Sequence, residues 1–164
     1  MELYFKEKLS LRGKVEVTDQ DGNVVYSGKR SFFTGNLTLK DKDGKKLITI
    51  VEKGGIFGRR FIIKSGMFKT VAVMKQKISL INQKFRVKKL DWDIKGNFTA
   101  KEYQILKGET PIAEIKRAKL VALLETYVIE IHSEEDAASI IAVALVLNQI
   151  LGEKKSKLVG KVAG

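Results

Sequence analysis

The sequence predicts a mainly β protein: a closed antiparallel barrel of about twelve strands with one apolar helix through its centre. Three observations support this prediction. Short runs of β-branched and aromatic residues, separated by Gly, Asp and Asn, fill the chain up to residue 132. Several runs resemble one another at steps of about 23 residues, which fits one two-stranded unit per repeat. A single long apolar segment follows them, from Ala137 to Leu151.

The chain of 164 residues fits one domain, with a core large enough to fold without disulfides. We expect this domain to cover residues 1–151, and the basic segment 152–164 to form a flexible C-terminal tail. The absence of cysteine excludes a disulfide framework, a thiolate metal site and a catalytic thiol. No secretory signal is visible, because Glu2 and Glu7 interrupt the apolar residues at the start. A cytoplasmic location is expected, peripheral to the membrane if the function inferred below holds.

Turn signals divide the β-rich part into strands. Asp21-Gly22 and Asp43-Gly44 each stand between runs of β-branched residues, a spelling typical of type I′ hairpins. The Asp-x-Asp-Gly pattern also occurs in calcium loops, but neither copy has the bidentate Glu of an EF-hand loop. A sheet of this size has to curl or close. About twelve strands are predicted, near residues 3–8, 14–18, 24–29, 36–40, 46–53, 60–65, 70–77, 84–90, 92–96, 102–106, 111–118 and 126–132.

The last segment predicts a helix over residues 134–151. Ser133 is a good N-cap, and the three acidic residues that follow it place negative charge at the positive end of the helix dipole. From Ala137 to Leu151 the helix is apolar around nearly its whole circumference, so it requires burial on all sides. Such a stretch spans roughly 22 Å, which is short of the ~30 Å hydrocarbon core of a bilayer. A buried core helix is therefore favoured over a transmembrane one.

Basic residues are clustered in one part of the chain. The net charge is +12, and residues 53–90 contain no Asp or Glu. Such clustering indicates an anionic partner, whether nucleic acid, phospholipid or an acidic protein. A solvated lysine-rich face is the alternative. The basic residues of this segment are Lys53, Arg59, Arg60, Lys64, Lys69, Lys75, Lys77, Lys84, Arg86, Lys88 and Lys89.

Alternation within the predicted strands places some of these residues on the outer surface. Successive side chains of a strand point to opposite faces, and the apolar set faces the core. We expect the inward residues to be Phe61, Ile63, Ala72, Met74, Phe85 and Val87. The predicted anion-binding or phospholipid-binding face then consists of Arg60, Lys64, Lys75, Lys77, Lys84, Arg86 and Lys88.

No catalytic or metal site is predicted. His132, the single histidine, alternates with inward isoleucines and is interpreted as a residue of the barrel rim rather than a catalytic base. Asp91 and Asp93 share one face of a predicted strand, but solvation beside neighbouring lysines explains them equally well. The glycine-rich segment 53–60 lacks the Lys-Ser/Thr ending of a phosphate-binding P-loop. The chain is therefore expected to be no enzyme and to hold no cofactor.

Three segments carry a resemblance to a known family. They are LYFKEKLSLRGKVEVTDQDGNVVYSGK near the start, LDWDIKGNFTAKEYQI with Trp92, Gly96, Phe98 and Tyr103, and the closing YVIEIHSEEDAASIIAVALVLNQIL. With these segments the sequence resembles the LURP-one-related family, whose fold is that of the tubby C-terminal domain and the phospholipid scramblases. The resemblance implies a tubby C-terminal-like barrel with the helix through its centre. Tubby domains bind phosphoinositide headgroups, but no motif carries that site over residue by residue.

The expected function is a non-enzymatic binding or scaffolding module that engages phospholipid or phosphoinositide headgroups at an anionic membrane surface. A nucleic-acid-binding barrel is the first alternative. Single-strand binders pair a basic groove with exposed aromatic residues, whereas the phenylalanines of the basic segment are flanked by apolar residues and expected inward. A lipid carrier or scramblase-like protein is the second alternative. It needs a cavity, which the apolar helix should fill.

Overall fold

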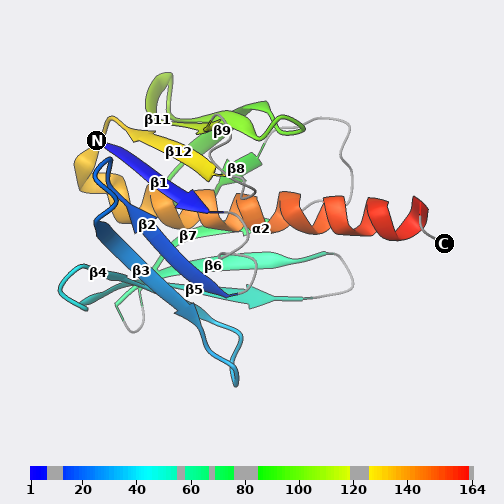
Figure 1. Ribbon diagram of the computed structural model, residues 1–164, viewed down its shortest axis with the longest axis horizontal. Helices are drawn as coiled ribbons and strands as arrows, with labels where there is room; N and C mark the ends of the chain where they lie inside the picture. Colours follow the sequence, from blue (N-terminus) through cyan, green and yellow to red (C-terminus); the bar gives the residue numbers. More distant parts are fainter. Residues whose placement is uncertain (7–12, 55–57, 67–68, 76–84, 119–125, 163–164) are drawn as a thin grey trace.

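The computed structural model describes residues 1–6, 13–54, 58–66, 69–75, 85–118 and 126–162, with side chains described up to Leu151. One sheet of twelve strands surrounds a single long helix (Figure 1). The strands are β1 (Glu2–Lys6), β2 (Lys14–Thr18), β3 (Val24–Arg30), β4 (Leu37–Asp41), β5 (Lys46–Lys53), β6 (Arg60–Ser65), β7 (Lys69–Lys75), β8 (Phe85–Val87), β9 (Trp92–Asn97), β10 (Glu102–Lys107), β11 (Thr110–Arg117) and β12 (Thr126–Ile131).

The strands are antiparallel and mostly follow one another as hairpins. Their order in the sheet is β7-β6-β5-β4-β3-β2-β1-β12-β11-β10-β9-β8, so β1 and β12 join the two halves of the chain. In the described part of the chain, the two outermost strands, β7 and β8, meet through one bridge, in which the backbone groups of Val73 and Lys88 exchange hydrogen bonds of 3.1 and 3.0 Å. We call this junction the seam. The predicted barrel of about twelve strands is confirmed, and it closes at the seam.

The predicted alternation is also confirmed. Strands β5, β6, β7 and β8, which carry the basic segment, send alternate side chains into the barrel, as a pleated strand requires. Phe85 is half-buried and packs against the core. The other predicted inward residues are fully buried: Phe61, Ile63, Ala72, Met74 and Val87.

The predicted core helix occupies the barrel centre, where it packs against strands on opposite sides (Figure 1). It begins as the 3₁₀ turn η1 (Glu134–Asp136) and continues as α2 (Ala137–Val162). The sequence suggested that the side chain of Ser133 caps this helix, but the structure shows no such hydrogen bond. The Ser133 hydroxyl instead donates to the Asp136 carboxylate at 2.9 Å. Within the described part of the chain, no helix has the length and apolar character needed to cross a membrane.

The helix runs past its predicted end at Leu151. It continues to Val162, so most of the segment that was expected to be a flexible tail is helical. Residues 153–158, EKKSKL, are mostly good helix formers, and lysines are favourable near the negative end of the helix dipole. The last turns project beyond the strands (Figure 1). We call this side of the barrel, where β3, β5 and β7 end, the exit end.

The eighth strand is shorter than predicted. It ends at Val87 because Lys89 and Asp91 adopt left-handed backbone conformations, with φ values of 73° and 53°, and turn the chain toward β9. Asp91 therefore lies in a turn and not beside Asp93 on a strand, as the sequence had suggested.

Candidate functional site

Basic side chains of three neighbouring strands stand directly opposite one another near the exit end. Lys53 of β5 pairs with Arg60 of β6, and Arg60 pairs with Lys75 of β7. All three are exposed on the outer surface. Among the residues that the structure describes, no carboxylate lies within salt-bridge distance of any of them. Like charges placed opposite one another destabilise a sheet, by roughly 0.2–1 kcal/mol per pair, so this row lowers the stability of the isolated barrel.

An apolar row lies beside the basic row on the same outer surface. Val51 pairs with Ile62, and Ile62 pairs with Val73, and all three are partly exposed. They point away from the core because their neighbours along each strand point into it. Lys64 stands in the next row, opposite Thr49. We call this surface the β5–β7 face, and it consists of Lys53, Arg60, Lys64, Lys75, Val51, Ile62 and Val73.

Across the seam, β8 and the residue that follows it add two of the predicted residues, Arg86 and Lys88. Lys88 is exposed and ends the apolar row through its bridge to Val73. Arg86 is exposed too, but its Nη2 donates a hydrogen bond of 2.9 Å to Asp91 Oδ1. This hydrogen bond and the charges of Asp91 and Asp93 raise the pKa of Arg86. Arg86 therefore belongs to a patch of mixed charge and attracts anions less than a lone cation would.

Four of the seven predicted face residues thus lie together with little neutralisation: Arg60, Lys64, Lys75 and Lys88. Lys77 and Lys84 lie outside the described residues. Two features of the face were missed by the sequence reasoning, namely Lys53 and the apolar row. The alternation of β5 contains the signal for both, because Val51 and Lys53 are outward by the same parity that sends Ile50 inward.

A polar network ties the helix to the barrel at the exit end. Arg30 Nη2 donates to Gln149 Oε1 at 2.7 Å, and Gln149 Nε2 donates to Glu52 Oε2 at 3.1 Å. Arg59 Nε donates to the other oxygen of Glu52 and its guanidinium lies 5.2 Å from the centre of the Phe61 ring. Burial alone would raise the pKa of Glu52, but the hydrogen bonds and charge of its partners lower it on balance. Arg30 and Arg59 therefore have structural partners, unlike the cations of the β5–β7 face.

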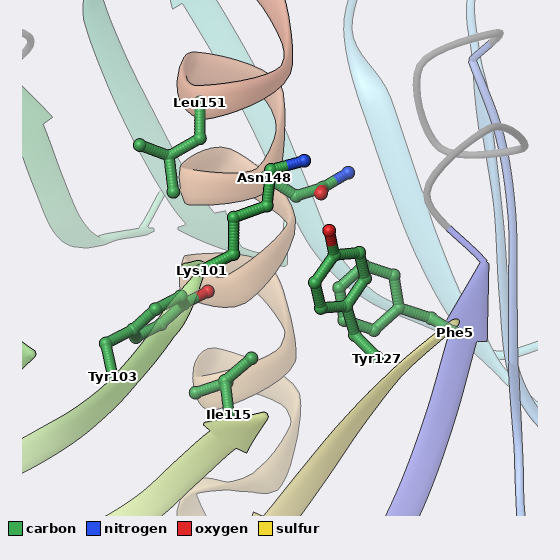
Figure 2. Close-up of a pocket in the computed structure, with 7 residues that line it drawn as sticks. All are labelled: Phe5, Lys101, Tyr103, Ile115, Tyr127, Asn148 and Leu151. Atoms are coloured by element: carbon green, nitrogen blue, oxygen red, sulfur yellow. The ribbon is translucent and has the colours of Figure 1, made fainter. Parts of the chain in front are cut away.

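A second polar cluster is buried between the helix and the β10–β12 side of the barrel. Lys101 is only 7% exposed and Asn148 only 4%. Figure 2 shows the side chains of Lys101 and Tyr127 directed toward Asn148, and the Lys101 ammonium lies 5.4 Å from the centre of the Tyr127 ring. Burial raises the pKa of Tyr103, which lines the same space. No pattern in the sequence indicates that a lysine is buried there.

The space inside this cluster is small. Its free volume is about 10 Å³, enough for about one water molecule. Ligand sites usually occupy ~300–1,000 Å³. The cluster is therefore a packing feature of the core, and it offers no room for the lipid that the carrier alternative requires.

The other candidates for chemistry are unremarkable in the described residues. His132 is exposed, as predicted for a residue of the barrel rim. In the parts of the chain that the structure describes, no three His, Cys, Asp or Glu side chains gather closely enough to hold a metal ion. Phe61 is buried and Phe85 is half-buried, so neither offers a stacking platform for a base. Phe57 and Phe68 lie outside the described residues.

Comparisons with known proteins agree with the barrel. The family model described as LURP-one-related matches residues 1–148. The uncharacterized protein YxjI of Bacillus subtilis strain 168 is 29% identical over 154 residues, which are 92% of this chain and 94% of that protein. The X-ray structure of the Arabidopsis thaliana protein AT5G01750 superposes with a TM-score of 0.65 at 17% identity, covering 91% of this chain and 90% of that one. At that identity the structural likeness shows the fold alone.

Proposed function

The chain belongs to the LURP-one-related family, and we propose that it is a non-enzymatic binding module that docks on anionic phospholipid membranes through the β5–β7 face. The observation that carries the proposal is the cross-strand row of Lys53, Arg60 and Lys75 beside an exposed apolar row. The isolated barrel gains no stability from three cations placed opposite one another. An anionic surface would neutralise them, so binding accounts for the arrangement.

The expected affinity follows from the charges of the face. A basic side chain close to an anionic bilayer contributes about 1 kcal/mol. The four cations of the face together would contribute up to about 4 kcal/mol, which alone corresponds to a dissociation constant near 1 mM. Partial burial of Val51, Ile62 and Val73 against the headgroups would add to this value. Binding should therefore be reversible, and weaker at high salt because exposed charges are screened over about 10 Å at 0.1 M.

Within the β5–β7 face itself, the character of the apolar row favours lipid over nucleic acid. Single-stranded nucleic acids bind where bases can stack on aromatic rings between the cations. Val51, Ile62 and Val73 are aliphatic and branched, so they offer no flat ring for stacking. Branched aliphatic side chains flanked by lysines instead match a surface that combines apolar tails with phosphate groups.

Vesicle sedimentation tests the proposal. We expect the wild-type protein to sediment with phosphatidylserine-containing vesicles at low salt, to be released at high salt, and not to sediment with neutral phosphatidylcholine vesicles. The variant Arg60→Glu with Lys75→Glu reverses two adjacent charges of the basic row and should lose sedimentation. Circular dichroism should show that this variant is folded, because both side chains are exposed.

A matched control separates the face from net charge. Lys42→Glu with Lys45→Glu makes the same change in charge on exposed residues of the β4–β5 turn, at the opposite end of β5. This control should still sediment with the anionic vesicles. Equal losses in both variants would show that only net charge matters. A wild-type protein that ignores anionic vesicles but binds nucleic acid would replace the membrane proposal by its first alternative.

A further inference from the structure

The connection between β3 and β4 holds two phenylalanines in solvent. Phe32 is 96% and Phe33 95% exposed, and their rings meet edge to face with centres 5.8 Å apart. In the described part of the chain no other large apolar side chain is as much as half exposed. The connection projects away from the barrel at the bottom of Figure 1. Phenylalanine is among the residues most often buried, so two of them at a projecting tip mark an interaction site.

The tip has a defined shape. Its base is closed by a backbone hydrogen bond of 2.8 Å from Ser31 to Asn36, and Gly35 bonds back to Ser31 at 2.9 Å with a left-handed φ of 68°. Arg30 then braces the tip, because its Nη1 donates to the Gly35 carbonyl at 2.6 Å while its Nη2 reaches Gln149 of the central helix. The two rings are therefore presented by a structured connection that is anchored to the core.

A basic groove lies at the base of the tip, on the outer surface of β2, β3 and β4. It has a volume of about 550 Å³, and its charged lining residues are Lys14, Glu16, Lys29, Arg30 and Lys40. Its single carboxylate, Glu16, is already paired with Lys14 at 3.1 Å. The sequence from residue 24 to 36 contains no Asp or Glu. The surroundings of the two rings are thus strongly cationic.

The groove is continuous with the β5–β7 face. The strand register connects Lys29 to Thr38, Thr38 to Thr49 and Thr49 to Lys64, without a break from β3 to β6. This outer row contains only lysine and threonine, which bind anions through ammonium and hydroxyl groups. The tip and the proposed membrane face therefore border on one surface.

We infer that the Phe32–Phe33 tip inserts into the interfacial layer of an anionic bilayer while the basic groove beside it binds lipid phosphate groups. The inference rests on the proposed function and identifies the part of the protein that enters the lipid. A convex tip of two rings requires a deep matching pocket on a protein partner, whereas fluid lipid adapts to any convex shape. The surrounding cations match phosphate headgroups, and an apolar element flanked by Lys and Arg is the arrangement that buries its apolar side at the headgroup boundary.

The absence of cysteine allows a direct test. Phe33→Cys can be labelled at this position alone with the polarity-sensitive dye NBD. We expect the emission to shift to the blue and to brighten when phosphatidylserine-containing vesicles are added, and to stay unchanged with phosphatidylcholine vesicles. The control is Val24→Cys, a partly exposed position at the other end of β3, where the label should show no shift.

A second variant keeps the charges and removes the rings. Phe32→Ser with Phe33→Ser should bind anionic vesicles at least tenfold more weakly at intermediate salt, because the apolar burial of two rings is lost. Normal sedimentation of the labelled protein without a spectral shift, or an unweakened double variant, would show that the tip stays out of the lipid while the proposed function stands. No sedimentation of the wild type would refute the proposed function itself. A label at position 33 that is already blue-shifted without lipid, more so at higher protein concentration, would assign the tip to a protein contact and overturn the inference.

Discussion

Leu147 provides the sharpest test of the buried helix. It lies on α2 inside the barrel and is 0% exposed. Leu147→Ala removes three carbon atoms, which at about 0.8 kcal/mol for each buried group corresponds to a transfer loss of about 2.4 kcal/mol. Because strands surround the helix, the site can collapse little, and a cavity cost adds to the transfer term. We expect a total loss of about 3–5 kcal/mol, in the upper part of the range for Leu→Ala changes.

Urea unfolding, followed by circular dichroism, measures this loss. In a separate thermal unfolding experiment, the melting temperature should fall by roughly 6–20 °C, since 1 kcal/mol corresponds to about 2–4 °C for a chain of this size. Phe33→Ala is the matched control: it truncates a larger apolar side chain that is 95% exposed, and should change the stability by less than about 0.5 kcal/mol. A Leu147→Ala variant as stable as wild type, or a Phe33→Ala variant that is equally destabilised, would contradict the described burial of one of these side chains.

Two further predictions concern the barrel wall. Because the folded state lowers the pKa of Glu52, this carboxylate stabilises the fold above its unfolded pKa of about 4.3 and loses that contribution as the pH falls through the lower folded value. Glu52→Gln should therefore be less stable than wild type at neutral pH, and its stability should fall less on acidification. Urea unfolding at a series of pH values measures the free energy of unfolding of both proteins. An equal dependence of this free energy on pH in the two proteins would contradict the role of Arg59 as the partner of Glu52. Gly96→Ala would place its Cβ 2.4 Å from the Glu102 carbonyl oxygen at a φ of 151°, so β9 and β10 must separate, at a cost of several kcal/mol. Gly54→Ala is the control, because the space around its new Cβ is open, and it should unfold at the same urea concentration as wild type. Equal midpoints of urea unfolding for the two alanine variants would show that β9 and β10 do not approach closely at position 96.

The sequence was sufficient for the strands and their inward residues because parity is a local property. Once Phe61 or Met74 faces the core, every second neighbour on the strand faces it too. Parity cannot predict which residues meet across strands. The bulge between Ile63 and Lys64 shifts the register by one residue, and this shift helps to set the pairing of Arg60 with Lys75. Cross-strand rows therefore became visible only in the structure.

Features made by distant segments were likewise beyond the sequence. Lys101 is buried because Tyr127 and Asn148 lie beside it, and neither is near it along the chain. The cations of the groove, such as Lys14 and Lys29, are separated along the sequence by apolar and polar residues, so no cluster is visible there. The barrel brings them together because β2 and β3 are neighbours.

The seam has a consequence for how the protein can be made. The helix follows the twelve described strands in the sequence, so a ribosome releases these strands before the residues that fill their centre. A barrel that was already shut would have to admit this helix lengthwise. Since a single bridge joins β7 and β8 among the residues that the structure describes, the sheet can instead remain an open, curved ribbon and wrap around the helix once it emerges. The seam then closes last, after the centre has been filled.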